Sequence, residues 1–306
     1  MRSPHAIPPA RLVEQEAVSE WFELVRPALC APWIDLRFVY NTDETVITLT
    51  EGKPLRIAMD IDERARPIVE GGQPYTQHVT FLPLVCADGE AFGNIVLLSS
   101  VATFLPPAFQ ANLPHVLNFR SPNGWITNDL FLHIVINIFV PAIEAKRRRL
   151  CCQDTPALLI ADGHISRYHP PLLHALSAHN ILLIILPPHT THLLQPLDVG
   201  MFGLFKSALR HMVRLIRKKE DFQSRCSELP RAARDRVLLA SSLDEAYRQK
   251  FTPFYIRDAF AAAGLMPFAP DRVLQRVQFR TDVSSPHPRP AHMVRPIGII
   301  RPPDGA

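Results

Sequence analysis

The sequence predicts an α/β protein in which a mixed β-sheet is flanked by helices and followed by a helical C-terminal extension. Two unbroken apolar runs, ALLIA (157–161) and ILLIIL (181–186), are typical of buried parallel strands, and a helical segment lies between them. A third observation adds an antiparallel hairpin. The segment HVTFLPLVCADGEAFGNIVLLSS (78–100) places two strand-like runs around Asp88-Gly89, which is a strong turn signal.

The remaining elements follow from apolar spacing and from capping residues. A helix is expected over 11–29, and a strand over 38–49 that is interrupted or closed near Asp43. The segment 124–149 predicts a helix capped by Thr127 or Asn128, with a basic carboxyl end. Further helices are expected over 170–180, from Asp198 onward, and through 220–274. After about Thr281 the chain is rich in Pro, Arg and His, which favours a disordered tail.

Composition limits the class of protein. The 306 residues are 47% apolar, enough for a large core, and 33 basic minus 29 acidic residues gives a net charge of +4. This charge permits a polyanionic partner without requiring one. Five cysteines without a CxxC pair argue against a disulfide framework or a zinc knuckle. No signal peptide is recognisable, and the apolar runs fall far short of the ~20 residues that span a bilayer, so an intracellular protein without a membrane partner is expected.

Three aspartates stand where strands end. Asp162 directly follows ALLIA, Asp198 follows ILLIIL and a short loop at a helix start, and Asp43 lies within or just after the first strand. Ligands of open α/β sheets bind at the carboxyl ends of strands, and three carboxylates together repel one another unless a cation neutralises them. The alternative is structural, because Asp162-Gly163 is a common turn and Asp198 a good N-cap. The pattern alone leaves both interpretations open.

Longer stretches around these aspartates resemble a known family. The segment LPPHTTHLLQPLDVGMFGLFK (186–206), preceded by DGHxS (162–166) and a strand, is similar to the catalytic core of pogo/Tigger/jerky-type transposases, which are DDE superfamily endonucleases. YNTDET (40–45) resembles the first acidic motif of that family, and the hairpin resembles its hairpin. NGWITNDLFLHIV (123–135) and IRDAFAAAGLMPFAPDRVL (256–274) extend the resemblance to about residues 35–275, in the order of the family.

The resemblance implies a ribonuclease H-like fold and a catalytic, metal-binding triad of Asp43, Asp162 and Asp198, with 35 residues between the last two. It implies two Mg²⁺ or Mn²⁺ ions, cleavage and strand transfer on DNA such as transposon ends, a nuclear location and a homodimer. The corresponding domains are an N-terminal helical lead-in (1–30), a DDE catalytic core (31–219), a helical C-terminal extension (220–280) and a tail (281–306).

The chain departs from the family pattern in three places. Val46 stands where the DETG motif has glycine, and Ile165 and Arg167 stand where DGHGSH has glycine and histidine. Such transposases usually carry an N-terminal helix-turn-helix, for which about 30 residues are too few. A fragment or a domesticated copy is therefore expected. The alternative function is a domesticated, non-catalytic DNA- or chromatin-binding protein.

Basic and histidine side chains supply secondary candidates. Four basic residues recur at helical spacing after Asp198 and are candidate DNA contacts, although a solvated helix face is the common alternative: Lys206, Arg210, Arg214 and Arg217. The run 146–149 is either only a helix end or part of a nuclear-import or DNA-contact patch. His164 is a candidate phosphate contact or a structural residue. His189 and His192 are interpreted as loop-shaping, Glu44 as structural, and Trp125 as a core or fold marker.

Overall fold

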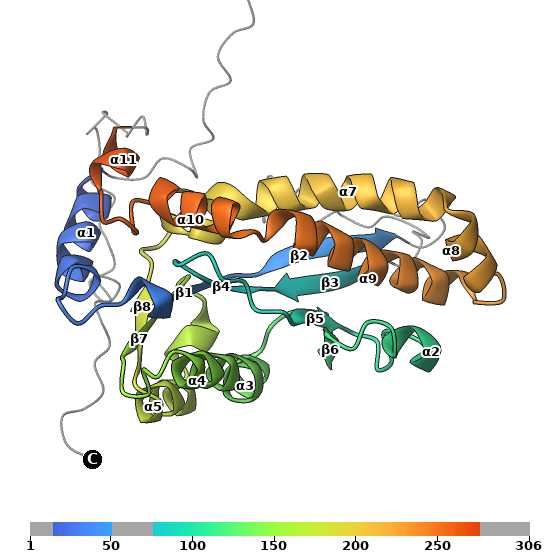
Figure 1. Ribbon diagram of the computed structural model, residues 1–306, viewed down its shortest axis with the longest axis horizontal. Coiled ribbons are helices and arrows are strands. Elements are labelled where there is room, and N and C mark those ends of the chain that lie inside the picture. The colour runs from blue at the N-terminus through green and yellow to red at the C-terminus, as the bar shows by residue number, and fades with distance from the viewer. Residues whose placement is uncertain (1–14, 51–75, 276–306) are drawn as a thin grey trace, which may run out of the picture.

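The computed structural model describes residues 15–50 and 76–275 (Figure 1). The predicted C-terminal tail lies outside these residues. The strands form two four-stranded sheets, ordered β4-β1-β7-β8 and β2-β3-β5-β6. Their bounds are β1 Val39–Thr42, β2 Thr45–Thr50, β3 Thr76–Leu82, β4 Leu84–Cys86, β5 Ile95–Ser99, β6 Val116–Arg120, β7 Ala157–Ala161 and β8 Ile181–Ile185.

The two sheets are parts of one larger strand order. Only residues 43 and 44 separate β1 from β2, and only Pro83 separates β3 from β4. Joining these strands gives the order β5, β3/β4, β1/β2, β7, β8, in which the first three are antiparallel neighbours and the last three are parallel neighbours. This topology is the ribonuclease H-like arrangement, so the predicted fold class is confirmed. The parallel pairing of β6 with β5 was not anticipated.

Helices cover both faces of this sheet (Figure 1). They are α1 Gln15–Leu29, α2 Pro107–Gln110, α3 Asn128–Ile134, α4 Val140–Arg149, α5 Pro170–Ala178, α6 Thr191–Leu194, α7 Phe202–Lys218, α8 Glu220–Arg225, α9 Arg231–Lys250, α10 Pro253–Ala262 and α11 Asp271–Leu274. Two π-helical turns, η3 Val135–Phe139 and η5 Leu197–Met201, precede α4 and α7. Two 3₁₀ turns, η2 Leu36–Phe38 and η4 Ile165–Tyr168, complete the set.

The apolar runs are buried on both faces because successive side chains of a strand point to opposite sides. Leu158 and Ile160 of β7 pack into the cluster formed with α1, α7, α9 and α10. Leu159 and Ala161 pack into the second cluster, beneath α3, α4 and α5. The predicted parallel strands with crossover helices are therefore confirmed. One core extends from α7 into α9, across the expected domain boundary at residue 219, which itself stays a prediction.

The helix expected over 124–149 begins at Asn128, and Thr127 rather than Asn128 is its cap, since the Thr127 hydroxyl accepts a hydrogen bond from Leu130 N at 3.2 Å. Within the described ranges, Asn128–Arg149 is the one helix whose length and composition would allow it to cross a membrane, and 33% of its apolar window is buried. Here one of its sides packs against the sheet, through residues such as Phe131, Ile134 and Ile143.

Candidate active site

The strand register brings Asp43 and Asp162 to the same edge of the sheet. β1 and β7 are parallel neighbours, with Asn41 opposite Ile160, so the aspartates that follow each strand lie side by side. Asp43 sits in the break between β1 and β2 and is 7% exposed, and its Oδ1 accepts a hydrogen bond from Glu44 N at 2.8 Å. The break itself therefore turns the first aspartate toward the edge where β7 ends.

Asp198 reaches the same place from the helical side. It lies in the π turn η5, directly before α7, rather than at an ordinary helix N-terminus. π turns of this kind often occur at functional sites. The pKa of Asp43 is raised well above its usual value, first by burial and then by the negative charges of Asp198 and Asp162. The structure thus brings together all three aspartates that the sequence singled out.

A buried amide pair connects the strand of Asp43 to the turn of Asp198. Asn41, fully buried, donates from Nδ2 to Ile160 O and to Gln195 Oε1, each at 2.9 Å, and its Oδ1 accepts from Leu197 N at 3.2 Å. Gln195 in turn donates to Thr42 O at 3.3 Å. These bonds fix β1, β7 and the loop before η5 relative to one another. The sequence contained both amides, within YNTDET and QPLD, but their roles were missed because nothing in the pattern pairs them.

Helix α10 supports the turn from outside. A Cβ placed on Gly200 would lie 2.7 Å from Ala259 Cβ and 2.9 Å from its Cα. The backbones of η5 and α10 therefore approach too closely for any residue larger than glycine. Because Gly200 is two residues from Asp198, this contact also helps to set where the Asp198 carboxylate lies.

Arg167 is the second feature that the sequence analysis did not assign. Its side chain is fully buried, and one amino group, Nη2, lies 2.8 Å from Glu44 Oε1 and 3.1 Å from Asp162 Oδ1. Its other amino group donates to Ser166 Oγ at 2.6 Å, and its guanidinium carbon lies 3.8 Å from the centre of the Phe131 ring. Glu44 therefore has a structural partner, as interpreted from the sequence. In the sequence, the signal that pointed to Arg167 was that it stands where the family pattern has histidine.

The donor chemistry suits a hard divalent cation. Three carboxylates converge, and Asp162 Oδ1 is buried without a hydrogen-bond donor, although it faces Arg167. Oxygen ligands of this kind are those that Mg²⁺ and Mn²⁺ take. Across residues 15–50 and 76–275, no three His, Cys, Asp or Glu side chains are arranged to hold one ion as they stand. In the structure Asp162 Oδ1 instead faces the guanidinium of Arg167 at 3.1 Å.

The histidines near the site differ in placement. His164 is exposed, and its Nδ1 lies 2.9 Å from Ser166 Oγ and accepts from Ser166 N at 3.3 Å, which caps the η4 turn. This bond supports the structural alternative for Nδ1 of His164. His189 adopts a left-handed backbone conformation with φ +62° in the loop before α6. Trp125 is 51% exposed, and its ring centre lies 6.0 Å from that of His78 with the rings tilted, so its interpretation as a core residue is wrong.

The expected basic stripe on α7 is only partly on the surface. Lys206 is 9% exposed, Arg210 and Arg217 are half-buried, and Arg214 is exposed. The charge of Arg217 also acts on Asp235 of α9, lowering a pKa that burial raises. Contact of these residues with DNA stays a prediction, and Arg214 is the member with the most open side chain.

The second basic run is mainly structural. Lys146 Nζ is buried and lies 2.6 Å from Asp88 and 2.9 Å from Glu90, while Arg147 donates to two backbone carbonyls of the α5–β8 connection. Arg149 pairs with Glu90 at 2.8 Å. Three of the four basic side chains therefore hold the hairpin and the helices together, which favours the helix-end interpretation of the run.

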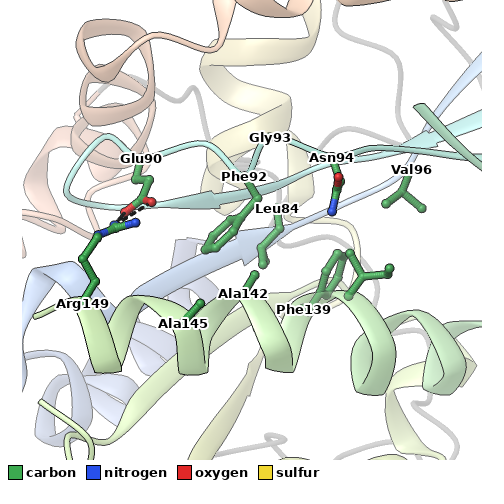
Figure 2. A pocket seen from close by; sticks show the side chains of 11 residues that line it. Leu84, Glu90, Phe92, Gly93, Asn94, Val96, Phe139, Ala142, Ala145 and Arg149 are labelled. Atoms are coloured by element: carbon green, nitrogen blue, oxygen red, sulfur yellow. Dashed lines mark hydrogen bonds and ion pairs between the residues drawn. The ribbon is translucent and has the colours of Figure 1, made fainter. Parts of the chain in front are cut away.

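A pocket of about 250 Å³ lies between the β4–β5 connection and α4. Figure 2 shows the ion pair of Glu90 with Arg149 at one end and the apolar side chains of Leu84, Phe92 and Phe139 along its wall. None of the three aspartates lines it. The acidic edge of the sheet, which has the perturbed carboxyl group, is therefore the better candidate for chemistry.

The fold and the acidic edge together define a ribonuclease H-like protein with a carboxylate site. Comparison with family models agrees with this class, because residues 105–231 match the DDE superfamily endonuclease family. Residues 105–231 are thus similar to the DDE superfamily endonucleases, and the resemblance seen in the sequence is confirmed. The match includes Asp162 and Asp198, while Asp43 precedes it.

The chain is also similar to individual proteins. It is 27% identical over 245 residues to "MFS-type transporter clz9" of Cochliobolus lunatus, which covers 79% of this chain and 24% of that protein. The chain thus spans about a quarter of the length of this relative. Among solved structures, a Mos1 transposase paired-end complex with the left transposon end has a TM-score of 0.40 at 12% identity, over 86% of this chain and 65% of that chain. The catalytic domain of Mos1 mariner transposase has a TM-score of 0.37 at 11% identity, over 86% and 98%.

Proposed function

We propose that the chain is the core of a transposase-derived endonuclease that cleaves phosphodiester bonds of DNA and transfers the cleaved strand, with divalent metal ions as cofactors. One observation carries the proposal. Three carboxylates from separate parts of the chain meet at one edge of a ribonuclease H-like sheet, where burial and then the charges of Asp198 and Asp162 raise the pKa of Asp43. A protein gains nothing in stability from such crowding, so a cation-binding role explains it better than turn or cap roles.

The three aspartates act together in the proposed chemistry. Asp43, Asp162 and Asp198 would hold the Mg²⁺ or Mn²⁺ ions. Such a pair of ions, when bound, activates the attacking oxygen and stabilises the leaving oxygen of a phosphodiester. The buried Asn41–Gln195 pair holds the segments that carry the three carboxylates in fixed positions relative to one another. The proposed partner is DNA, and a nuclear location and a homodimer belong to the same proposal.

Two features support DNA as the substrate. The matched family is one of endonucleases. Arg214 is exposed on the helix that begins directly after the Asp198 turn, where a phosphate backbone entering the site would pass.

A non-catalytic DNA- or chromatin-binding protein is the second candidate, and a specific contact favours it. Arg167 already supplies a positive charge 3.1 Å from Asp162 Oδ1, in the place where a metal ion would be sought. The name of the transporter relative gives weaker support for a membrane role.

Among the described helices, Asn128–Arg149 alone is long and apolar enough to cross a membrane, but in this fold one of its sides packs against the sheet.

Nicking of supercoiled plasmid by the purified chain tests the proposal. With Mg²⁺ or Mn²⁺ the wild type is expected to nick, Asp162→Asn to lose the activity, and Asp221→Asn to keep it. Asp221 is the matched control because its carboxylate is 77% exposed on α8 and its ion pair within the described residues is with Arg225, one helical turn away. Equal nicking by Asp162→Asn, or nicking that persists in EDTA, would refute the metal-dependent mechanism. A gel shift of DNA without nicking would favour the second candidate.

A further inference from the structure

We infer that Arg167 is a positioning residue that acts as a built-in counter-charge of the acidic site and sets how tightly the site takes a divalent cation. The inference rests on the proposed function in one respect, namely that Asp162 is a metal ligand. It assigns to this chain a charge that neither the family match nor the triad accounts for.

The geometry shows a cation placed inside the site rather than beside it. Arg167 is 0% exposed, and a single amino group of its guanidinium faces both Glu44 Oε1 at 2.8 Å and Asp162 Oδ1 at 3.1 Å. Glu44 is adjacent in the chain to Asp43. The guanidinium therefore joins the first and second acidic motifs, which come from neighbouring strands.

The side chain is held so that it cannot easily leave. Its other amino group donates to the buried hydroxyl of Ser166 at 2.6 Å, and its plane lies over the Phe131 ring with 3.8 Å from its central carbon to the ring centre. Cation–π contacts and charge-assisted hydrogen bonds both strengthen when the charged group is desolvated, as the fully buried Arg167 side chain is. The guanidinium thus places a positive charge directly beside the carboxylates of Glu44 and Asp162.

A fixed positive charge has two consequences for the three aspartates. It offsets part of their repulsion, which lets the site fold before any ion binds. It also repels a divalent ion that approaches Asp162. For a unit charge and a divalent ion about 6 Å apart, even a water-like dielectric gives a repulsion that corresponds to about a tenfold loss of affinity. Histidine, which the family pattern has at this place, would carry the charge only in part at neutral pH.

Binding of Mn²⁺ alone tests this assignment without any use of catalysis. The free-ion signal in electron paramagnetic resonance is titrated for the wild type, Arg167→Gln and Arg167→Lys. Glutamine keeps a hydrogen-bond donor for Glu44 but no charge, and is expected to bind Mn²⁺ about tenfold more tightly than the wild type. Lysine keeps the charge and is expected to stay near the wild type. Arg167→Gln that is folded and binds Mn²⁺ equally or more weakly would overturn the inference.

The same titration separates this inference from the proposed function. If the wild type does not bind Mn²⁺ but Arg167→Gln does, the metal-dependent function fails while the counter-charge role stands. If the wild type binds and nicks DNA but Arg167→Gln binds no more tightly, the counter-charge role fails and the function stands. Should Arg167→Gln not fold, Glu44→Gln is compared with the double variant Glu44→Gln/Arg167→Met. Both lack the glutamate charge, so tighter binding by the double variant supports the inference and equal or weaker binding overturns it.

Discussion

Replacement of Asn41 by alanine is expected to destabilise the chain by about 3 kcal/mol and to impair nicking. The Asn41 side chain is fully buried and takes part in three hydrogen bonds, at 2.9, 2.9 and 3.2 Å. A buried hydrogen bond contributes about 1 kcal/mol net, and its loss leaves buried partners that water does not reach. For a domain of this size that loss lowers Tm by about 6–12 °C.

Thermal unfolding followed by circular dichroism measures this effect, with Asn112→Ala as the matched control. Asn112 is exposed and donates one bond to the Ala108 carbonyl within its own turn, so its removal should change the free energy of unfolding by less than about 0.5 kcal/mol. If Asn41→Ala is no less stable than the control, the amide pair does not hold the aspartate-bearing segments together. A normal Tm with lost nicking would instead limit its role to alignment of the site.

Three further predictions concern close packing, pH and buried charge. Gly200→Ala should destabilise by about 1–3 kcal/mol in urea unfolding because its Cβ meets the α10 backbone, whereas Gly203→Ala, with nothing within 4 Å, should be neutral or stabilising. Folding raises the pKa of Asp43, so the folded protein loses stability as the pH rises above about 4, the usual pKa of an unfolded aspartate. Asp43→Asn removes this penalty and should therefore raise the Tm of the metal-free protein at pH 7. The gain in Tm should shrink as the pH is lowered toward 4. Lys146→Met should cost about 3 kcal/mol in the same unfolding assay, because it removes a buried ammonium group that pairs with Asp88 and Glu90, whose side chains are only partly exposed. Arg149→Ala, which removes a 59% exposed partner, should cost at most about 1 kcal/mol, and equal losses would contradict the burial argument.

Much of the sheet was predictable because its signals are local. ALLIA and ILLIIL predicted buried parallel strands, and β7 and β8 have those bounds to within one residue. The interruption near Asp43 is the break between β1 and β2. The missed strand β6 has a mixed pattern, with one fully buried residue among partly buried ones, so its apolar periodicity is weak. Its place beside β5 is decided by pairing rather than by its own composition.

The positions of Asp43 and Asp162 were predictable from the rule that parallel strands bring their carboxyl ends together. The site around them was not. Asn41 and Gln195 are 154 residues apart in the sequence and meet only when β1 lies beside the loop before η5. The π turn that carries Asp198 was not predicted from the sequence, and its Gly200 lies against α10, a contact that only the tertiary structure shows.

By itself the sequence determined which residues are apolar and where strands end, and hence that three aspartates would meet at one edge of a sheet. It also contained the family resemblance that the match over residues 105–231 confirms. Only the tertiary structure decided what surrounds those aspartates. The approach of η4 to α3 buries Arg167 against Phe131 and between the two acidic motifs. The energy of a buried charge depends on the groups around it. Of the groups that contact Arg167 here, Ser166 is its neighbour in the chain, whereas Glu44, Phe131 and Asp162 are brought to it by the fold.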